Sequence, residues 1–134
     1  MPKIRIRDAA AYLSVSDDTV RRWIDVGMLP AETDEHNRKV IDGFALATFA
    51  QAQANPMTDP SRVDSSARNR FVGLVTKITV DKVMAQVELQ CGPYRVVSLL
   101  SSEAVTDLGL ELGSVAVAVI KSTNVIIESP SGDS

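Results

Sequence analysis

The sequence predicts an α+β protein of two domains, the first helical and the second a small β-barrel. Apolar residues follow the spacing of helices before about residue 55 and the two-residue spacing of strands after it. The stretch from Ala54 to Ser65 contains two prolines and several small polar residues, which is typical of a linker. The expected organisation is a first domain over 1–53, a linker over 54–64, a second domain over 65–129 and a disordered tail over 130–134.

Composition and charge narrow the classes of protein. Hydrophobic residues make up 45% of the chain but aromatic residues only 4%, so the core must be aliphatic, and small domains of this kind favour oligomerisation. The net charge of -3 argues against coating nucleic acid by bulk charge, although it allows a local basic patch. The single cysteine, Cys91, excludes an internal disulfide and cysteine-based zinc sites. A charged start and the lack of a membrane-length apolar run predict a cytoplasmic protein.

The first half predicts the order helix, turn, helix, hairpin, helix. The helices are expected over 6–13, 17–26 and 40–53. Ser16 is a good N-cap for the second helix, and Gly27 is a natural end for it. Ala9, Ala10 and Leu13 are expected to face inward from the first helix.

The second half predicts short strands separated by turns. They are expected over 71–80, 84–91, 94–100, 114–120 and 124–128, as a barrel-like set. Val87 and Leu89 should face the core, with Glu88 between them on the other face. One helical turn, capped by Ser101 or Ser102, is expected to end at Gly109.

Two helices joined by a short turn are the elements of a helix-turn-helix. The start of the second helix can lie in the major groove, where arginines neutralise phosphates or read guanine, and the following loop can reach the neighbouring backbone. Aspartates share this helix, so the charges fit a solvated helical hairpin equally well. The candidate DNA contacts are Thr19, Arg21, Arg22, Arg38 and Lys39.

The stretch from Ala9 to Pro30 resembles the winged helix-turn-helix of MerR and excisionase-type proteins. The shared features are Leu-Ser-Val-Ser at 13–16, Thr-Val-Arg-Arg-Trp at 19–23 and Gly-x-Leu-Pro at 27–30. The stretch from Asn37 to Gly43 resembles their wing, which is usually more basic than it is here. The resemblance covers about residues 4–53 and implies binding to a double-stranded DNA operator.

A series of short motifs occurs in order in the second half. They are Ser66-Ala-Arg-Asn69, Gly73, Leu108-Gly-Leu-x-x-Gly113 and Ile120-Lys-Ser-Thr-x-Val125. Taken separately, they fit a strand start and a solvated lysine better than a site. Together they resemble the Mop domain of molbindins and ModE-type regulators, an OB-like β-barrel that binds molybdate. The resemblance covers about residues 65–128 and implies molybdate or tungstate as the ligand.

The resemblance also implies which groups hold the oxyanion. Ser66 would supply a hydroxyl, Lys121 an ammonium, and Ala67, Arg68 and Ser122 their backbone N–H groups. Molybdate is a dianion whose oxygens only accept hydrogen bonds, so an all-donor site suits it and disfavours protonated phosphate. Sulfate must be rejected by size. No bare metal cation is expected, because molybdenum enters only as the oxyanion.

In the Mop family the binding sites lie between subunits. The resemblance therefore implies that Ser66 and Arg68 of one chain meet Lys121 and Ser122 of another. A homo-hexamer is expected, as for molbindins with one Mop unit per chain, and a dimer is the alternative. One departure is Asp107, which stands where ModE-type proteins often have a basic residue.

The two halves together predict a transcriptional regulator that responds to molybdate or tungstate. One alternative is an oxyanion storage protein whose first domain serves assembly, and another is an excisionase-like architectural DNA protein. An enzyme is not expected, because the sequence lacks triad residues, a phosphate-binding glycine loop and paired carboxylates at a plausible site.

Overall fold

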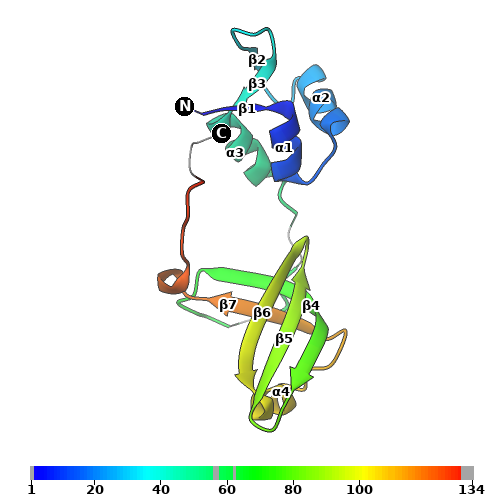
Figure 1. The fold of residues 1–134 in the computed structure, drawn as a ribbon, viewed down its shortest axis with the longest axis vertical. Coiled ribbons are helices and arrows are strands. Elements are labelled where there is room, and N and C mark those ends of the chain that lie inside the picture. The colour runs from blue at the N-terminus through cyan, green and yellow to red at the C-terminus, as the bar shows by residue number, and fades with distance from the viewer. Residues whose placement is uncertain (1, 56–57, 62, 131–134) are drawn as a thin grey trace. The chain divides into compact units, whose positions relative to one another are not determined.

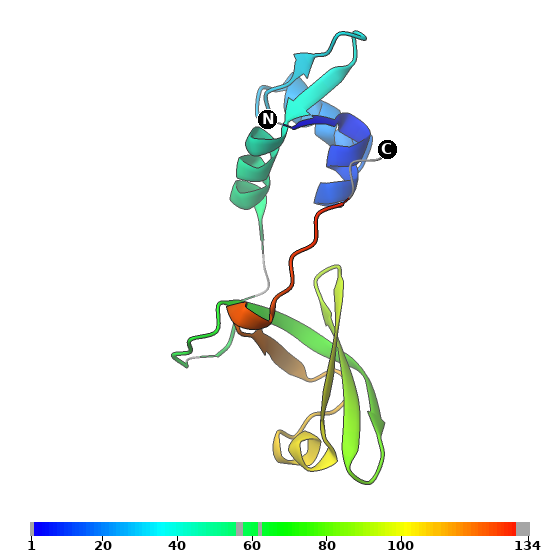
Figure 2. The same cartoon turned by 60° about the vertical axis from the view of Figure 1, so that its left-hand side comes forward.

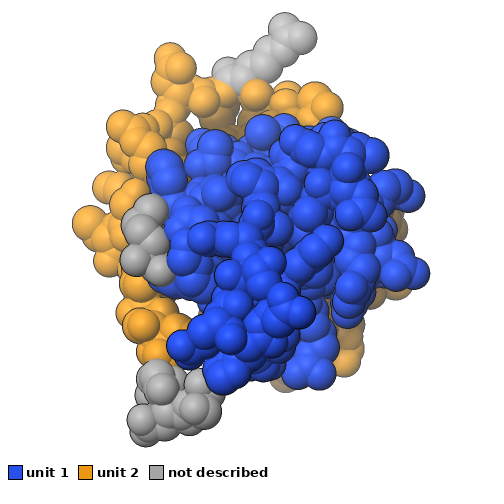
Figure 3. Space-filling model, turned by 90° about the horizontal axis from the view of Figure 1, so that it is seen from above, with its two compact units in different colours: residues 1–55 blue, residues 56–134 orange. Residues whose placement is uncertain are grey.

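The computed structural model describes residues 2–55, 58–61 and 63–130. The chain forms two compact units, unit 1 over residues 1–55 and unit 2 over residues 56–134 (Figure 3). Residues 56, 57 and 62 of the expected linker and residues 131–134 of the expected tail lie outside the described residues. No helix in the described part of the chain is long and apolar enough to cross a membrane.

Unit 1 combines helices with a small antiparallel sheet (Figure 1). The helices are α1 (Ile6–Leu13), α2 (Asp17–Asp25) and α3 (Gly43–Gln53). The strands are β1 (Lys3–Arg5), β2 (Glu32–Thr33) and β3 (Lys39–Asp42), in the order β1-β3-β2. The buried core consists of Ile6, Ala9, Ala10, Val20, Leu29, Ile41 and Leu46. Leu13, expected to face inward, is half-buried against this core.

The connection between α1 and α2 follows from the residues there. Ser14 adopts a left-handed φ of 57° at the end of α1. Ser16 caps α2 as expected, because its Oγ accepts the Thr19 N–H at 3.1 Å. Gly27, with a φ of 82°, follows α2 and lets the chain turn back toward the buried Leu29.

The third helix begins later than predicted, at Gly43 instead of residue 40. Val40 and Ile41 belong to β3 and pair with Arg5 and Ile4 of β1, a strand that was not predicted. Asp42 then caps α3 by accepting the Ala45 N–H at 3.1 Å. The prediction was wrong here because the β-branched pair gains a strand partner from the distant N-terminus, which local spacing does not reveal.

Unit 2 is a curled antiparallel sheet (Figures 1 and 2). Its elements are β4 (Asn69–Val80), β5 (Met84–Cys91), β6 (Tyr94–Ser101), α4 (Ser102–Asp107), β7 (Val115–Ile120) and the short 3-10 helix η1 (Ser122–Asn124). The strand order is β6-β5-β4-β7. The first half of β4 pairs with β7, and its second half pairs with β5. The β4–β5 pairing has a register shift between Val75 and Lys77. One long strand therefore serves both sides of the curled sheet.

Glu88, predicted on the face opposite Val87 and Leu89, is itself buried. Val87 and Leu89 are buried as expected, but Glu88 is only 7% exposed. Its carboxylate forms an ion pair with Arg95 of the neighbouring strand β6. The long side chain of arginine covers the glutamate, so an outward-facing position becomes a buried one.

The last predicted strand, over 124–128, does not form in the described structure. η1 occupies its start, and residues 125–130 have no regular structure. Val125, Ile126 and Ile127 are 40%, 84% and 85% exposed. Each of β6 and β7 has one unpaired edge, so the sheet is a half-barrel. Its concave side holds a groove of about 590 Å³ lined largely by apolar side chains of β5, β6 and β7. The local apolar pattern shows that a segment favours a strand, but it does not show whether the segment reaches an edge of the sheet.

Candidate oxyanion site and nucleic-acid interface

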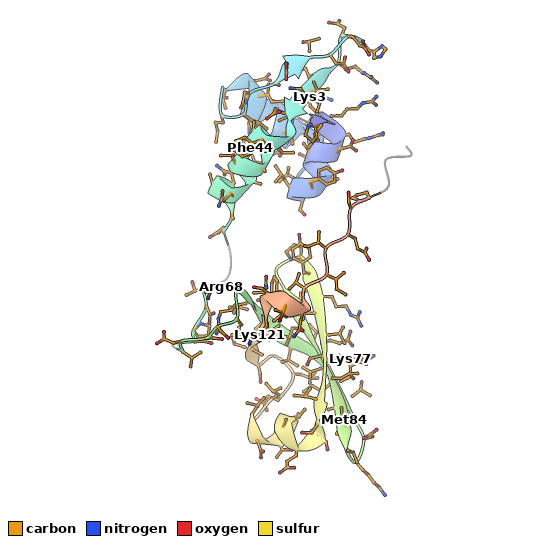
Figure 4. All side chains as sticks on the ribbon, turned by 90° about the vertical axis from the view of Figure 1, so that its left-hand side faces the viewer. Lys3, Phe44, Arg68, Lys77, Met84 and Lys121 are labelled. Carbon is orange, nitrogen blue, oxygen red and sulfur yellow. The ribbon has the colours of Figure 1, made fainter. Side chains whose placement is uncertain are left out.

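The β4–β7 ladder brings the two predicted oxyanion segments to one end of the sheet. Asn69, the first residue of β4, pairs with Ile120, the last residue of β7. Arg68 directly precedes this pair and Lys121 directly follows it, and Figure 4 shows both at the same end of the sheet. Segments that lie more than fifty residues apart in sequence thus become neighbours within a single chain.

The first segment contains a local turn. Ser66 and Arg68 are exposed, and Ala67 between them is only 8% exposed. The Ala67 N–H, predicted as an oxyanion donor, donates to Ser65 Oγ at 3.1 Å. A serine hydroxyl that accepts this bond keeps its own proton to donate. The Ser65 hydroxyl is therefore a further candidate donor to an oxyanion. The sequence motif did not indicate it, although Ser65 directly precedes the motif.

The second segment is the start of η1. Lys121 has an extended backbone, with φ of -66° and ψ of 144°, and caps the turn. The hydrogen bonds of the turn run from Asn124 N–H to Lys121 carbonyl and from Val125 N–H to Ser122 carbonyl. These bonds leave the N–H of Ser122 unused by the turn, as at the start of any helix. Lys121 and Ser122 are both exposed.

Further bonds hold the first segment in place. The Asn69 side chain donates from Nδ2 to the Ile120 carbonyl at 3.2 Å, which joins the two strand ends. Arg70 Nε lies 2.9 Å from Asp59 Oδ2, and Asp59 Oδ1 accepts the Ser61 N–H at 2.8 Å. The Ser61 N–H and the Arg70 guanidinium lower the pKa of Asp59. Asp59 belongs to the predicted linker, where no periodic pattern indicates such a contact.

The charges at this end of the sheet suit an anion. Among the described residues, neither Arg68 nor Lys121 forms an ion pair with a carboxylate. α4, which ends at Asp107, is attached to the opposite end of β4, because Ser102 bonds to the carbonyls of Lys82 and Val83 in the β4–β5 turn. Within one chain Asp107 is thus placed away from the two cations. The end of the sheet offers hydroxyls, N–H groups and cations, which is the donor set that a fully deprotonated oxyanion requires.

The predicted nucleic-acid contacts of unit 1 fall into two groups. Arg21 and Arg22 are exposed on α2 and form no ion pair among the described residues. Thr19 lies in the first turn of α2, where its hydroxyl is bonded to Ser16 at 2.9 Å.

The cations of the β2–β3 hairpin are already near carboxylates. Arg38 Nε lies 3.3 Å from Asp34, and Lys39 Nζ lies 4.0 Å from Asp25. Asp34 also accepts the backbone N–H groups of His36 and Arg38, which orders the hairpin turn and lowers the pKa of Asp34. Among the predicted contacts, the arginines of α2 are therefore less paired with carboxylates than the cations of the hairpin.

Comparison with known proteins covers the half of the chain that contains the oxyanion segments. The TOBE domain model matches residues 65–127. Molybdenum-pterin-binding protein 3 of Clostridium pasteurianum is 41% identical over 63 residues, which are 46% of this chain and 93% of that protein. The chain belongs to the TOBE-domain family. The range that the domain model matches contains Ser66, Arg68, Lys121 and the Asn69–Ile120 pair.

Two further similarities fall in the same half. The molybdenum transport protein ModE of Herbaspirillum seropedicae is 36% identical over 64 residues, which are 47% of this chain but only 24% of that protein. The solved structure of the cytoplasmic molybdate-binding protein ModG with molybdate bound is 44% identical, with a TM-score of 0.48, and the match covers 52% of this chain and 50% of that one.

Proposed function

We propose that this protein is a DNA-binding regulator that senses molybdate or tungstate. The observation that carries the proposal is the end of the β4–β7 ladder, where Arg68 and Lys121 adjoin the Asn69–Ile120 pair (Figure 4) and neither forms an ion pair with a carboxylate among the described residues. Relatives that share this half of the chain are named for molybdenum binding or transport. Unit 1, with exposed arginines on α2, would supply the contact with DNA.

The donor set accounts for the choice of anion. Two cations attract a dianion, and the hydroxyls of Ser65 and Ser66 with the N–H of Ser122 can each donate one hydrogen bond to its oxygens. A protonated phosphate is favoured by a carboxylate that accepts its proton, and this set contains hydroxyls but no carboxylate. Molybdate and tungstate have nearly the same size and charge, so both are proposed as ligands.

Exposed apolar surface supports assembly of several copies of the chain. The unpaired run Val125-Ile126-Ile127 exposes three consecutive β-branched side chains, and the groove of the half-barrel is open. Covering both in a homo-oligomer would remove this surface from water. We propose that Lys121 and Ser122, directly before the exposed run, then meet Ser66 and Arg68 of another copy, in a hexamer or alternatively a dimer.

Selective anion binding is the direct test of the sensor. Isothermal titration calorimetry of the full chain should show molybdate and tungstate binding well above sulfate and phosphate. Sulfate and molybdate differ in size but not in hydrogen-bonding character, so the proposed site must separate them through a fixed geometry. Sulfate that competes equally with molybdate would therefore contradict the proposed site.

The DNA-binding proposal predicts that α2 matters more than the hairpin. Replacing Arg22 with Ala should weaken binding to duplexes that the wild type selects from a random library, and should reduce the slope of log affinity against log salt by about one phosphate contact. Replacing Arg38 with Ala should have a smaller effect, because Asp34 already offsets its charge. Electrophoretic mobility shifts over a range of salt concentrations measure both.

Molybdate binding serves as the internal control for these variants, because neither arginine belongs to unit 2. Equal DNA affinity in the wild type, Arg22→Ala and Arg21→Ala would contradict the role of α2. That result would favour the second candidate, an oxyanion storage protein. The small Clostridium relative supports this candidate, since the region shared with unit 2 makes up 93% of that protein.

A further inference from the structure

Asn69 lies between the two segments of the proposed site, Ser66–Arg68 (the first arm) and Lys121–Ser122 (the second arm). Its neighbour Arg68 is the last residue of the first arm. Its cross-strand partner Ile120 directly precedes Lys121, the first residue of the second arm. The side-chain amide Nδ2 donates to the Ile120 carbonyl at 3.2 Å. The bond spans the last pair of the ladder, the position at which two strands most readily separate.

We propose that Asn69 is the positioning residue that fixes both arms of a chain at the end of its sheet, and thereby the size of oxyanion that the site between subunits accepts. This inference rests on the proposed function. Asn69 is half-buried at the strand end, so its amide is placed to hold the strands and not to face the ligand.

Selection by size requires arms at fixed positions, because the candidate anions do not differ in charge or in hydrogen-bonding character. Sulfate and molybdate are both tetrahedral dianions whose oxygens accept hydrogen bonds. Arms that move apart or together freely would fit either anion, whereas arms at a fixed spacing fit one size best. In a symmetric assembly each chain supplies the first arm to one site and the second arm to another. The Asn69 bond of each chain fixes both of its arms on its own sheet.

Two other bonds reinforce the first arm but do not join it to the second. The Ala67 N–H to Ser65 bond shapes the turn, and the Asp59–Arg70 pair holds the preceding segment to β4. Among the side-chain bonds of the described residues, the Asn69 bond is the one that ties the β4 end to the β7 end at the site.

Calorimetry with sodium molybdate and sodium sulfate on the full-length protein tests the inference. The variants are Asn69→Ala, Asn69→Thr and, as a matched control, Asn124→Ala. Thr favours strands but lacks an amide, so this variant keeps the strand preference and loses the donor. Asn124 lies in η1, is exposed, and its side chain makes no hydrogen bond among the described residues.

Both Asn69 variants should lose about tenfold in molybdate affinity, the effect of one hydrogen bond. Sulfate affinity should fall less, so the preference for molybdate narrows. Asn124→Ala should retain the affinities and the preference of the wild type. A purely structural role would lower the melting temperature of the anion-free protein but leave the preference intact well below that temperature.

The outcomes separate the two proposals. Wild-type protein that does not bind molybdate would contradict the proposed function itself. Wild-type binding with unchanged affinity and preference in folded Asn69 variants would overturn the inference and leave the function standing. If neither variant folds, nuclear magnetic resonance of the wild type decides. The Asn69 side-chain amide should be protected from exchange before anion is added, and rapid exchange with water would overturn the inference.

Discussion

Replacing Lys121 with Ala is expected to lower molybdate affinity by about ten- to a hundredfold, the effect of losing one charged hydrogen bond to a bound anion. Lys121 follows β7 directly and has no carboxylate partner among the described residues, so its charge is available to the ligand. Because an anion that binds the folded assembly stabilises it, molybdate should raise the melting temperature of the wild type. Lys121→Ala should lose most of that increase.

Lys77→Ala is the matched control for this substitution. Lys77 is also an exposed lysine of unit 2, but it lies on β4 roughly 25 Å along the strand from Asn69. Figure 4 shows the two lysines at separate places on the sheet. Thermal melts of the three proteins with and without molybdate provide the measurement. An equal molybdate-induced shift in the wild type and Lys121→Ala would show that Lys121 does not hold the anion.

Mixed assemblies determine whether the site lies within one chain or between two. Ser66→Asp places a carboxylate in the first arm, and Lys121→Ala removes the cation of the second arm. In assemblies that contain both chains, a site between subunits can combine an intact Ser66 with an intact Lys121, so part of the molybdate binding returns. A site within one chain always retains one defect, so binding stays as weak as in the single variants. Native mass spectrometry of the mixture reports bound anions for each assembly.

Replacing Gly73 with Ala is expected to destabilise unit 2 by about 1–3 kcal/mol or more, as insertion into a packed interior does. Gly73 is a buried residue of β4, next to Leu74, which pairs with Gln90 near the end of β5. A Cβ added there would lie 2.6 Å from Cys91 Sγ and 2.6 Å from the Gln90 carbonyl oxygen. A backbone atom has no rotamer by which to move aside, so β5 itself must shift.

Urea unfolding of unit 2 in the full chain measures this loss. Adding Cys91→Ala to Gly73→Ala removes the sulfur but leaves the Gln90 carbonyl, so only part of the stability should return. Complete recovery would show that the thiol alone opposes a side chain at this position. An unfolding midpoint of Gly73→Ala equal to that of the wild type would show that β4 and β5 are further apart than the structure has them.

The sequence by itself determined much of the secondary structure, because local chemistry decides it. Ser16 accepts a backbone N–H wherever a helix follows it, and the alternation around Val87 and Leu89 fits a sheet with one buried face. The motifs at 66–69 and 120–125 indicated the oxyanion family, which the comparisons confirm for residues 65–127. The individual ligand roles of Ser66, Ala67, Arg68, Lys121 and Ser122 remain predictions.

The tertiary structure alone decided which segments pair and which remain without a partner. Val40 and Ile41 became a strand because β1 lies beside them, and Glu88 became buried because Arg95 covers it from the next strand. The Asn69–Ile120 bond depends on a register that neither segment specifies. Val125, Ile126 and Ile127 have the composition of a strand but pair with no edge of the sheet in the described chain. Pairing is a property of two segments, so a pattern read along one segment predicts its preference but not its partner.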